Sequence, residues 1–533
     1  MLTLQQLSYI HPNRDLLFAN INLTVNDKEK IALIGNNGAG KSTLLKIVAG
    51  ELPYADGQLT VDSKPYYVPQ IFGQYNHLTI AQALGMDGKL NALKEILDGN
   101  ATEENFSLLN DDWTIEARCK EALDYWQLSD LSLSVKMEAL SGGQKTKVLL
   151  AGIAIHEPNL VLLDEPSNHL DIEGRQLLYD FIQATKSTLI VVSHDRKLLN
   201  LLETVCELGE EGIKVYGGNY DFYSEQKSIE SNALNHEILS KERALRIAKQ
   251  KDRETLERQQ KLDARGSKKQ AKAGMGHAMM DKMKNDAENS SSKLKNLHTK
   301  KVAAISQDLS GLRASLSSID KMKFGFDNST LHKGKILFTA KDVNFSYNTE
   351  PLWNENLNFQ IASGERIALK GQNGSGKTTL IRLVLGQIEP QTGTLYRAVN
   401  RSVYIDQDYS LIDNNLKVYE QAQQFNSAAL QEHEIKIRLN RFLFGKEGWE
   451  KQCGALSGGE RMRLMLCGLT ISNRSPDVII LDEPTNNLDI QNIEILTAAI
   501  DEYKGTLIVV SHDETFLEKI AILRTIDLKI NKS

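Results

Sequence analysis

Two glycine-rich segments have the composition and spacing of phosphate-binding loops. They read GNNGAGKS at 35–42 and GQNGSGKT at 371–378, and each follows an apolar run, KIALIG or RIALKG. Glycines in this pattern let backbone N–H groups turn inward around phosphate oxygens, and the following helix adds its positive N-terminal end. The residues expected to bind the phosphates are Gly35, Asn36, Asn37, Gly38, Ala39, Gly40, Lys41, Ser42 and Thr43 in the first segment and Gly371, Gln372, Asn373, Gly374, Ser375, Gly376, Lys377, Thr378 and Thr379 in the second.

The last two residues of each segment have separate predicted roles. Lys41 and Lys377 are expected to reach the β- and γ-phosphates of a nucleotide, and Ser42 and Thr378 to bind Mg²⁺. One such segment can arise by chance, but two in matching contexts predict two nucleotide sites.

An Asp-Glu pair ends an apolar run in each half of the chain. Asp164 and Glu165 follow LVLL, and Asp482 and Glu483 follow VIIL. Such runs are typical of buried parallel strands, so the aspartates should lie at the carboxyl edge of a sheet, where they could bind Mg²⁺. The adjacent glutamates are candidate catalytic residues that polarise the attacking water. The alternative is that these acids only cap helices.

Two further residue pairs also follow predicted strands. Gln70 and Gln407 close PYYVP and SVYID, and we expect them to reach Mg²⁺ and the water. His194 and His512 follow two LIVVS runs and are candidate catalytic contacts to the γ-phosphate. A lone histidine there would more often be a packed side chain, but the repetition beside Asp favours the functional role.

The chain repeats itself. The first loop recurs after 336 residues, whereas LSGGQ, LVLLDEP and VSHD recur, as LSGGE, VIILDEP and VSHD, after 316 to 318. This predicts two copies of one domain over 1–222 and 335–533, with 20 extra residues in the first copy near 85–115.

The segment between the copies differs in charge. Residues 225–325 hold 22 Lys and Arg against 13 Asp and Glu, a net charge of +9, which leaves the rest of the chain with 41 against 56, a net of −15. Apolar residues at steps of three and four between Val302 and Ile319 predict a coiled-coil helix, and a long charged stretch without Pro or Gly precedes it. We expect a helical hairpin linker over 223–334, with a basic tip at about 263–291.

The LSGGQ and LSGGE segments resemble the signature motif of ATP-binding cassettes. A Ser-Gly-Gly turn that opens a helix is an anion site, but it has no lysine and no preceding strand, so it cannot bind ATP alone. The resemblance implies that each signature completes the site built on the other domain's phosphate loop, and that ATP holds the pair closed until hydrolysis. The residues so implied are Ser141, Gly142, Gly143 and Gln144 for the 371–378 loop and Ser457, Gly458, Gly459 and Glu460 for the 35–42 loop.

The adenine contacts are predicted by the same resemblance. VNFSYN at 343–348 is similar to the family's aromatic loop, with Tyr347 on the base. The matching LSYIHP at 7–12 favours His11 as the adenine contact, with Tyr9 as the alternative. For each of these residues, the other possibility is an aromatic side chain that only packs in a strand.

Two cassettes on one chain, joined by about 100 charged helical residues, resemble the ABC-F family. The expected fold class is α/β: two cassettes of the phosphate-loop NTPase type joined by a coiled-coil hairpin. The resemblance implies a soluble ATPase that uses ATP and Mg²⁺ and acts on the ribosome, as a translation factor or as an antibiotic-resistance protein that protects ribosomes. In that family the hairpin tip reaches rRNA and tRNA.

The predicted tip has the charge for such a contact. Five lysines there could neutralise RNA phosphates, and its methionines could add apolar contacts. The candidates for RNA binding are Lys268, Lys269, Lys272, Lys282 and Lys284. A solvated hairpin that only tethers two domains is the alternative.

Other function classes are less well supported by this chain. A tandem cassette acting on DNA would be expected to carry a C-terminal coiled coil, and a chromosome-type ATPase would place its long helices inside a cassette. The engine of a transporter would need a separate membrane subunit and would leave the basic linker unexplained.

Composition sets the remaining expectations. No apolar run approaches the roughly 18 residues of a membrane span, and the N-terminal residues lack the pattern of a secretion signal. The four cysteines are scattered, which argues against a metal cluster and favours a reducing, cytoplasmic location. No stable homo-oligomer is required, because both cassettes lie on one chain.

Overall fold

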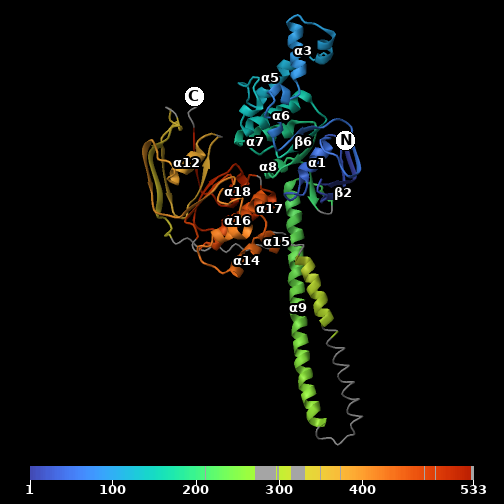
Figure 1. Ribbon diagram of the computed structural model, residues 1–533, viewed down its shortest axis with the longest axis vertical. Helices are drawn as coiled ribbons and strands as arrows, with labels where there is room; N and C mark the ends of the chain where they lie inside the picture. The colour runs from blue at the N-terminus through green and yellow to red at the C-terminus, as the bar shows by residue number, and fades with distance from the viewer. Residues whose placement is uncertain are drawn as a thin grey trace. The chain divides into compact units, whose positions relative to one another are not determined.

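The computed structural model describes residues 1–209, 212–270, 296, 299–313, 331–347, 350–372, 374–472, 475–486 and 488–529. The chain divides into two compact units, Met1–Tyr223 with Met322–Ser533, and Ser224–Lys321. The first unit contains two similar halves, here called cassette 1 (residues 1–223) and cassette 2 (described residues from 331 to 529). Figure 1 shows cassette 1 in blue to green and cassette 2 in yellow to red.

Cassette 1 contains two sheets. One is antiparallel in the order β2-β1-β4, and the other has the order β5-β6-β7-β3-β8-β9, with only β9 antiparallel to its neighbour. The strands are β1 (Leu2–Ile10), β2 (Leu16–Val25), β3 (Lys30–Ile34), β4 (Asp56–Val61), β5 (Tyr66–Val68), β6 (Leu160–Asp164), β7 (Thr188–Val192), β8 (Thr204–Gly209) and β9 (Gly212–Tyr216).

Cassette 2 repeats this arrangement. Its antiparallel sheet has the order β11-β10-β13 and its parallel sheet the order β14-β15-β16-β12-β17, which matches the five parallel strands of cassette 1. The strands are β10 (Ile336–Asn344), β11 (Leu357–Ala362), β12 (Arg366–Lys370), β13 (Thr392–Arg397), β14 (Ser402–Ile405), β15 (Val478–Asp482), β16 (Thr506–Val510) and β17 (Arg524–Asp527).

Helices follow the strands in both halves. In cassette 1 they are α1 (Lys41–Val48), α2 (Ile80–Ala83), α3 (Asp87–Leu97), α4 (Glu103–Leu109), α5 (Ile115–Tyr125), α6 (Gly142–His156), α7 (Ile172–Ala184) and α8 (Arg196–Leu199). In cassette 2 they are α12 (Lys377–Val384), α13 (Val418–Gln424), α14 (Glu432–Arg441), α15 (Lys446–Trp449), α16 (Gly458–Ile471), α17 (Ile490–Glu502) and α18 (Glu514–Lys519). The extra residues near 85–115 form α3 and α4.

The apolar runs are buried parallel strands. Every residue of β6, β7 and β16 is buried, as expected for a sheet covered on both faces. Leu162 and Ile190 belong to one core cluster and Val161 and Val191 to the other, because successive side chains point to opposite faces. The predicted fold class, two α/β cassettes with a helical segment between them, is confirmed.

Strand register determines which polar residues meet. Asp164 pairs with Val192, and Asp482 with Val510, at the carboxyl ends of adjacent parallel strands. The residues just beyond, including His194 and His512, therefore reach the same sheet edge as the Asp-Glu pairs.

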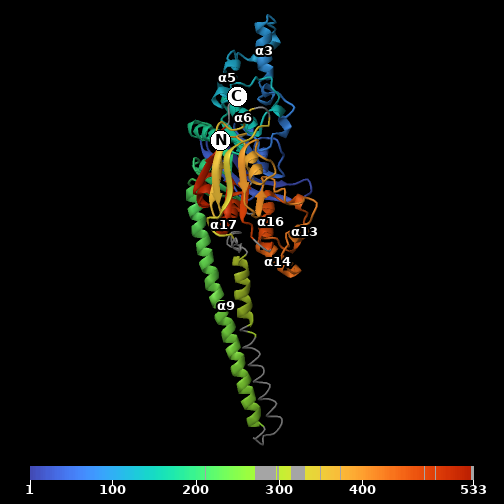
Figure 2. The ribbon, with the colours of Figure 1, turned by 90° about the vertical axis from the view of Figure 1, so that its left-hand side faces the viewer.

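The second unit contains two described helical segments. Helix α9 (Tyr220–Gln270) begins in the first unit, and residues 299–313 are also helical. The two lie side by side in Figure 1 and Figure 2, with Lys241 paired to Asp308 and with Ile238 and Leu309 buried. The predicted tip at 263–291 lies mostly outside the described residues, and both the coiled coil and the domain boundaries stay predictions.

Each phosphate loop is packed on an aromatic side chain. Gly40 and Gly376 cap α1 and α12 with φ of 98° and 85°, and a Cβ there would lie 2.8 Å from Phe18 Cδ1 and 3.0 Å from Trp353 Nε1. Only glycine adopts this backbone in so little space. The buried Trp353 indole also donates a hydrogen bond of 2.9 Å to the carbonyl oxygen of Ser375.

We expect Trp353→Phe to destabilise cassette 2 by about 1–2 kcal/mol, because the buried carbonyl loses its donor. Trp353→Ala should cost about 3–5 kcal/mol, since it also leaves a cavity. Urea unfolding without nucleotide measures both. Wild-type stability of the phenylalanine variant would show that the indole hydrogen bond does not stabilise the loop.

Candidate nucleotide-binding sites

The first phosphate loop holds a buried ammonium. Lys41 Nζ donates hydrogen bonds to the carbonyl oxygens of Gly35 at 2.7 Å and Asn36 at 3.1 Å. Burial lowers the pKa of Lys41, and the nearby carboxyl groups of Glu165, Asp489 and Asp164 oppose that change. The loop thus fixes a cation where phosphate oxygens would replace its own carbonyls.

Asp164, at the end of β6, lies against the loop. Its carboxyl group accepts hydrogen bonds from Ser42 and from Tyr67, the latter at 3.3 Å to Oδ2. Burial raises the pKa of Asp164, and these two hydroxyl groups oppose the rise. Its Oδ1 atom is buried and has no hydrogen-bond partner among the described residues. A free carboxylate oxygen beside a serine hydroxyl is a donor set that fits Mg²⁺, which prefers a few oxygen ligands and retains waters.

Glu165 and His194 form the polar end of the same site. His194 Nε2 lies 3.1 Å from Glu165 Oε1, but neither carboxylate oxygen has a hydrogen-bond partner among the described residues. Burial and the adjacent Asp164 raise the pKa of Glu165, to about 8, although Lys41 opposes them. Burial and Lys41 lower the pKa of His194 to about 3, so the imidazole is neutral. A buried carboxyl group without a donor can orient a water molecule.

Both candidate catalytic glutamates have an unusual backbone. The φ angle is 51° at Glu165 and 48° at Glu483, in the left-handed region. Hydrogen bonds from their N–H groups to the carbonyl oxygens of Val192 and Val510, both 2.8 Å, hold this turn. Strain of about 1 kcal/mol or more at the same position in both cassettes marks a functional constraint.

A cavity of about 430 Å³ joins these groups to residues of both cassettes. It gathers twelve of the predicted residues, including Ser457 from cassette 2. They are His11, Asn37, Gly38, Gly40, Lys41, Ser42, Thr43, Gln70, Asp164, Glu165, His194 and Ser457, and the cavity is also lined by Leu17, Asn168 and Val192. The structure thus brings a signature serine to the phosphate loop of the other cassette.

The second site repeats the chemistry. Lys377 Nζ donates to the carbonyl oxygens of Gly371 at 2.8 Å and Gln372 at 3.1 Å. The Asp482 Oδ2 atom accepts from Thr378 at 3.3 Å and from the Tyr404 hydroxyl at 2.9 Å.

The candidate catalytic pair of this second site is largely buried, with side-chain exposures of 10% at His512 and 14% at Glu483. His512 Nε2 lies 3.2 Å from Glu483 Oε1. Burial raises the pKa of Glu483 to about 7, and burial and Lys377 lower that of His512 to about 4.

Cassette 1 approaches the second site through different residues. Gln372 Nε2 donates to Glu173 Oε1 at 2.8 Å, whereas Asn37 N–H of the first site donates to Asp489 Oδ2 at 2.9 Å. Ser141 makes its hydrogen bonds with Gln144 of its own helix, and no contact between it and the 371–378 loop is seen in the described residues.

Both signature serines are helix N-caps. Ser141 and Gln144 form a capping box at α6, and Ser457 and Glu460 form one at α16. Each serine Oγ accepts from the backbone N–H three residues on, at 3.3 Å, so the hydroxyl hydrogen can still be donated. The glycines between them are the first residues of these helices.

The predicted adenine contacts differ between the sites. His11 lines the cavity, whereas Tyr9 packs between His11 and Phe18, so the geometry favours His11 over Tyr9. Tyr347 is 65 % exposed, and its hydroxyl bonds to the Thr379 hydroxyl at 2.9 Å.

Several predicted residues lie outside this geometry. Gln407 is exposed, and no described contact joins it to Asp482. Asn373 is not among the described residues, and neither are Lys272, Lys282 and Lys284 or the side chains of Lys268 and Lys269.

The sequence prediction omitted some polar partners. Tyr67 and Tyr404 bond the Asp164 and Asp482 carboxylates, and their equivalent places in two strands could have indicated this. Asp489 ends the repeated DExxxxLD stretch, which was a usable signal. Arg175, which lies near Glu483 and His512, has no repeated counterpart and gave none.

Sequence comparison decides the family. The ABC transporter family matches residues 18–168 and 354–486. The ATP-binding protein YdiF of Bacillus subtilis (strain 168) is 30% identical over 95% of this chain and 77% of its own length. This chain is a tandem ATP-binding-cassette protein of the ABC-F family. Its two cassettes are ATP-binding ATPase domains.

Other relatives of this ABC-F protein match along most of their length. The ATP-binding protein Uup of Escherichia coli (strain K12) is 29% identical over 94% of this chain and 76% of its own. YbiT of Escherichia coli O157:H7 is 29% identical over 95% of this chain and 92% of its own.

Solved structures share the fold of this ABC-F protein. An archaeal ABCE1 in complex with the ribosomal stalk protein aP1 aligns with a TM-score of 0.57 at 18% identity, over 97% of this chain and 86% of that one. The RNase-L inhibitor gives the same TM-score at 19% identity, over 98% and 87%. Among the described residues, no helix is long and apolar enough to cross a membrane.

The raised pKa values of Glu165 and Glu483, the two candidate catalytic glutamates, predict how stability depends on pH. Their pKa values rise from 4.5 to about 8 at Glu165 and about 7 at Glu483. The folded state therefore retains protons that the unfolded state loses, so this contribution is complete below pH 4.5 and disappears as the pH rises through 7 to 8. The wild-type protein should therefore lose stability as the pH rises, whereas Glu165→Gln and Glu483→Gln should not lose this contribution. Without nucleotide, the free energy of unfolding of each variant relative to wild type should increase by at least about 1 kcal/mol from pH 5 to pH 9.

Calorimetry in EDTA tests this, and Glu460→Gln is the matched control. Hydrogen bonds from Ser457 and Lys451 lower the pKa of Glu460 despite its burial, so this variant should lose stability at neutral pH. If the difference in unfolding free energy between wild type and either Glu165→Gln or Glu483→Gln did not change with pH, these two carboxyl groups would not have raised pKa values in the folded protein.

Proposed function

We propose that this ABC-F protein closes its cassettes around two ATP molecules with Mg²⁺ and uses the cycle of closure and hydrolysis to act on the ribosome. The observation that carries the first part is the cavity that Lys41, Glu165 and Ser457 line together. A site with residues from both cassettes binds its ligand best when they are together, so ATP shifts the chain toward closure.

The residues act in fixed roles. Lys41 and Lys377 leave their carbonyl partners for the β- and γ-phosphates, and the loop N–H groups bind the remaining oxygens. Ser42 with Asp164, and Thr378 with Asp482, would hold Mg²⁺, which would neutralise charge on the phosphates. Gln70, which lines the same cavity as Asp164, completes that environment at the first site, and Gln407 is its proposed counterpart at the second.

Glu165 and Glu483 orient the attacking water at the two sites. Their neutral histidine neighbours, His194 and His512, donate a hydrogen bond to the γ-phosphate. His11 and Tyr347 contact the adenine. Both sites have the same lysine, hydroxyl, aspartate, glutamate and histidine groups, so both hydrolyse ATP.

The signature serines complete the sites in a crossed arrangement. Ser457 donates its hydroxyl hydrogen to the γ-phosphate at the 35–42 loop, and Ser141 does so at the 371–378 loop. The positive ends of α16 and α6 add to that attraction.

The proposed target is the ribosome, through rRNA and tRNA in the cytoplasm. The charge layout supports it, because a +9 segment between halves totalling −15 concentrates the attraction for RNA in the linker. A structure of the same fold is described as an archaeal ribosome recycling factor. The five tip lysines would make the phosphate contacts, as part of a translation factor or an antibiotic-resistance protein.

Ser457→Arg should prevent trapping of ATP at the 35–42 loop and leave nucleotide binding to that loop within about threefold, since Lys41 and the loop are unchanged. Ser141→Arg is the matched variant for the other loop. In the Glu165→Gln, Glu483→Gln background, a photoreactive ATP analogue and peptide mapping identify the loop that keeps its nucleotide. Damage by Ser457→Arg at the Lys377 site alone would contradict the crossed arrangement.

Replacing Lys268, Lys269, Lys272, Lys282 and Lys284 by Gln should weaken ribosome co-sedimentation while ATP closure remains normal. Three or four phosphate contacts make binding fall by roughly one to two orders of magnitude between 50 and 200 mM salt, and the variant should lose most of that slope.

The control for the lysine variant removes five exposed lysines of the cassettes: Lys64, Lys94, Lys120, Lys446 and Lys504. It should retain the salt slope. Equal sedimentation of the tip variant and wild type at every salt concentration would favour a linker that only tethers the cassettes.

A further inference from the structure

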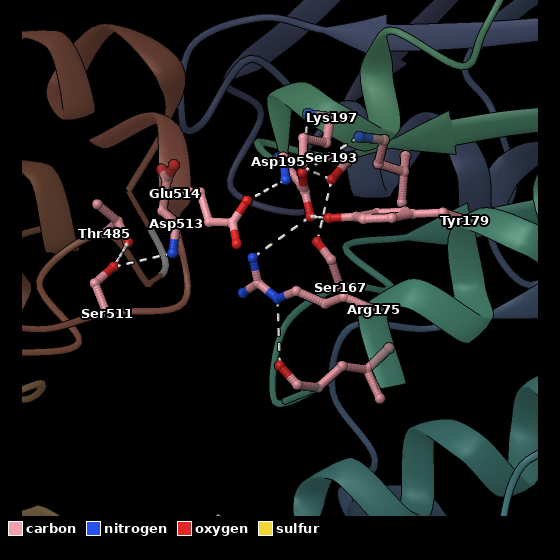
Figure 3. A network of polar contacts seen from close by, with 12 residues as sticks. Ser167, Arg175, Tyr179, Ser193, Asp195, Lys197, Thr485, Ser511, Asp513 and Glu514 are labelled. Carbon is pink, nitrogen blue, oxygen red and sulfur yellow. Dashed lines mark hydrogen bonds and ion pairs between the residues drawn. The ribbon is translucent and has the colours of Figure 1, made fainter. Parts of the chain in front are cut away.

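The segments that follow the two candidate catalytic histidines meet across the cassettes. Arg196 Nη2 lies 3.2 Å from Glu494 Oε1, and Lys197 forms an ion pair with Glu514 (Figure 3 shows the second contact). The Arg196 guanidinium also lies over the Tyr220 ring, 5.9 Å from its centroid. We call these four charged residues the seam.

A pair of aspartates lies beside the seam. Asp195 accepts from the Tyr179 hydroxyl at 2.6 Å and from Arg175 Nη1 at 3.4 Å, and Figure 3 shows Asp513 on the facing side. Burial raises the pKa of Asp513, and the negative charge of Asp195 adds to the rise. The Phe516 backbone N–H, Arg196 and Arg175 oppose it, so Asp513 is within electrostatic reach of Asp195 and of both arginines. Arginines of cassette 1 thus pair with acidic residues of both cassettes, Arg175 with Asp195 and Arg196 with Glu494.

The internal repeat shows that equivalent positions of the two cassettes carry different charges at the seam. With the offset of 318 residues, Arg196 corresponds to Glu514 and Lys197 to Thr515. Glu494 corresponds to Gln176 and Arg175 to Ile493. Cassette 1 therefore supplies the cations of the seam and cassette 2 the acids, although Lys519 of cassette 2 also lies near Arg196.

The nucleotide motifs do not share this asymmetry. Both cassettes carry a phosphate loop and a signature of the same kind, so ATP could join two copies of cassette 1 or two copies of cassette 2. Selection between unlike and like pairs must come from residues outside those motifs.

We propose that the seam selects pairing of cassette 1 with cassette 2 and rejects pairing of like cassettes from two copies of this chain. Two copies of cassette 1 would place Lys197 against Arg196. Two copies of cassette 2 would place Glu514 against Glu494 and bring two Asp513 carboxyl groups together without an arginine. Like charges at an interface suppress the wrong partner more strongly than an exposed ion pair stabilises the right one.

Two full-length charge-reversal variants test the proposal, which depends on the ATP-driven closure proposed above. The acidic variant carries Arg196→Glu and Lys197→Glu, and the basic variant carries Glu494→Lys and Glu514→Lys. Within each variant the seam charges now repel, so each alone should hydrolyse ATP at least about tenfold more slowly than wild type.

Mixing the two variants should restore hydrolysis. The reversed cassette 1 of one chain complements the reversed cassette 2 of the other, and their unchanged cassettes also match. With Glu165→Gln and Glu483→Gln added to both, ATP should produce a particle of twice the 59.6 kDa chain mass only in the mixture. One chain carrying all four reversals should close on itself and regain activity within about threefold.

The control reverses an ion pair inside cassette 2. Lys417→Glu and Glu450→Lys act on a pair with a 2.6 Å contact and should each leave ATPase within about twofold of wild type. Nucleotide binding by each seam variant shows that its cassettes are folded. Wild-type activity of both variants alone, or no recovery in the mixture or the four-reversal chain although ATP still binds, would overturn the proposal. If Ser457→Arg lost ATPase activity while both seam variants kept full activity, the proposed role of the seam in pairing would be wrong. The proposed ATP-driven closure would still stand.

Discussion

Buried polar atoms without partners are the constraint on which the nucleotide sites depend. Asp164 Oδ1, both carboxylate oxygens of Glu165 and Glu483 Oε2 are all buried and unsatisfied in the described chain. Leaving such a group unpaired costs about 1–3 kcal/mol, so the fold around it must be stable enough to tolerate the cost. The all-buried strands β6, β7 and β16 provide that stability next to the unsatisfied atoms. In the proposed function, ATP and Mg²⁺ supply these atoms with partners.

The parallel order of the strands explains why these polar groups lie at one edge of the sheet. A parallel sheet brings all its strand ends to one side, so the loop after β3, the acids after β6 and the histidine after β7 meet without further structure. Tyr67 and Tyr404 extend this from the next strand and orient the aspartates through their hydroxyl groups. Each cassette carries its own phosphate loop, and in the first site Ser457 of the other cassette lines the same cavity.

Much of this could be predicted because its signals are local. Apolar runs ending in Asp-Glu or Ser-His gave the buried strands and their polar ends, and the repeat gave two domains. The contacts between the cassettes were less accessible. Arg175, Arg196 and Glu494 belong to helices whose sequence shows only ordinary surface charge, and their partners are distant in sequence. Exposure of Gln407, unlike the cavity position of Gln70, also depends on loop geometry that spacing does not reveal.

Of the aromatic side chains packed against the two phosphate loops, only the one in cassette 2 carries a hydrogen-bond donor, so the two loops differ in conformational freedom before a nucleotide binds. In cassette 2, the Trp353 N–H fastens the loop at Ser375, whereas the corresponding Phe18 in cassette 1 contacts its loop only through carbon. A loop that is already fixed loses less conformational entropy on binding than one that must still become ordered. The two sites thus begin the cycle unequally preorganised, with the fastened loop on the side of the chain that follows the linker.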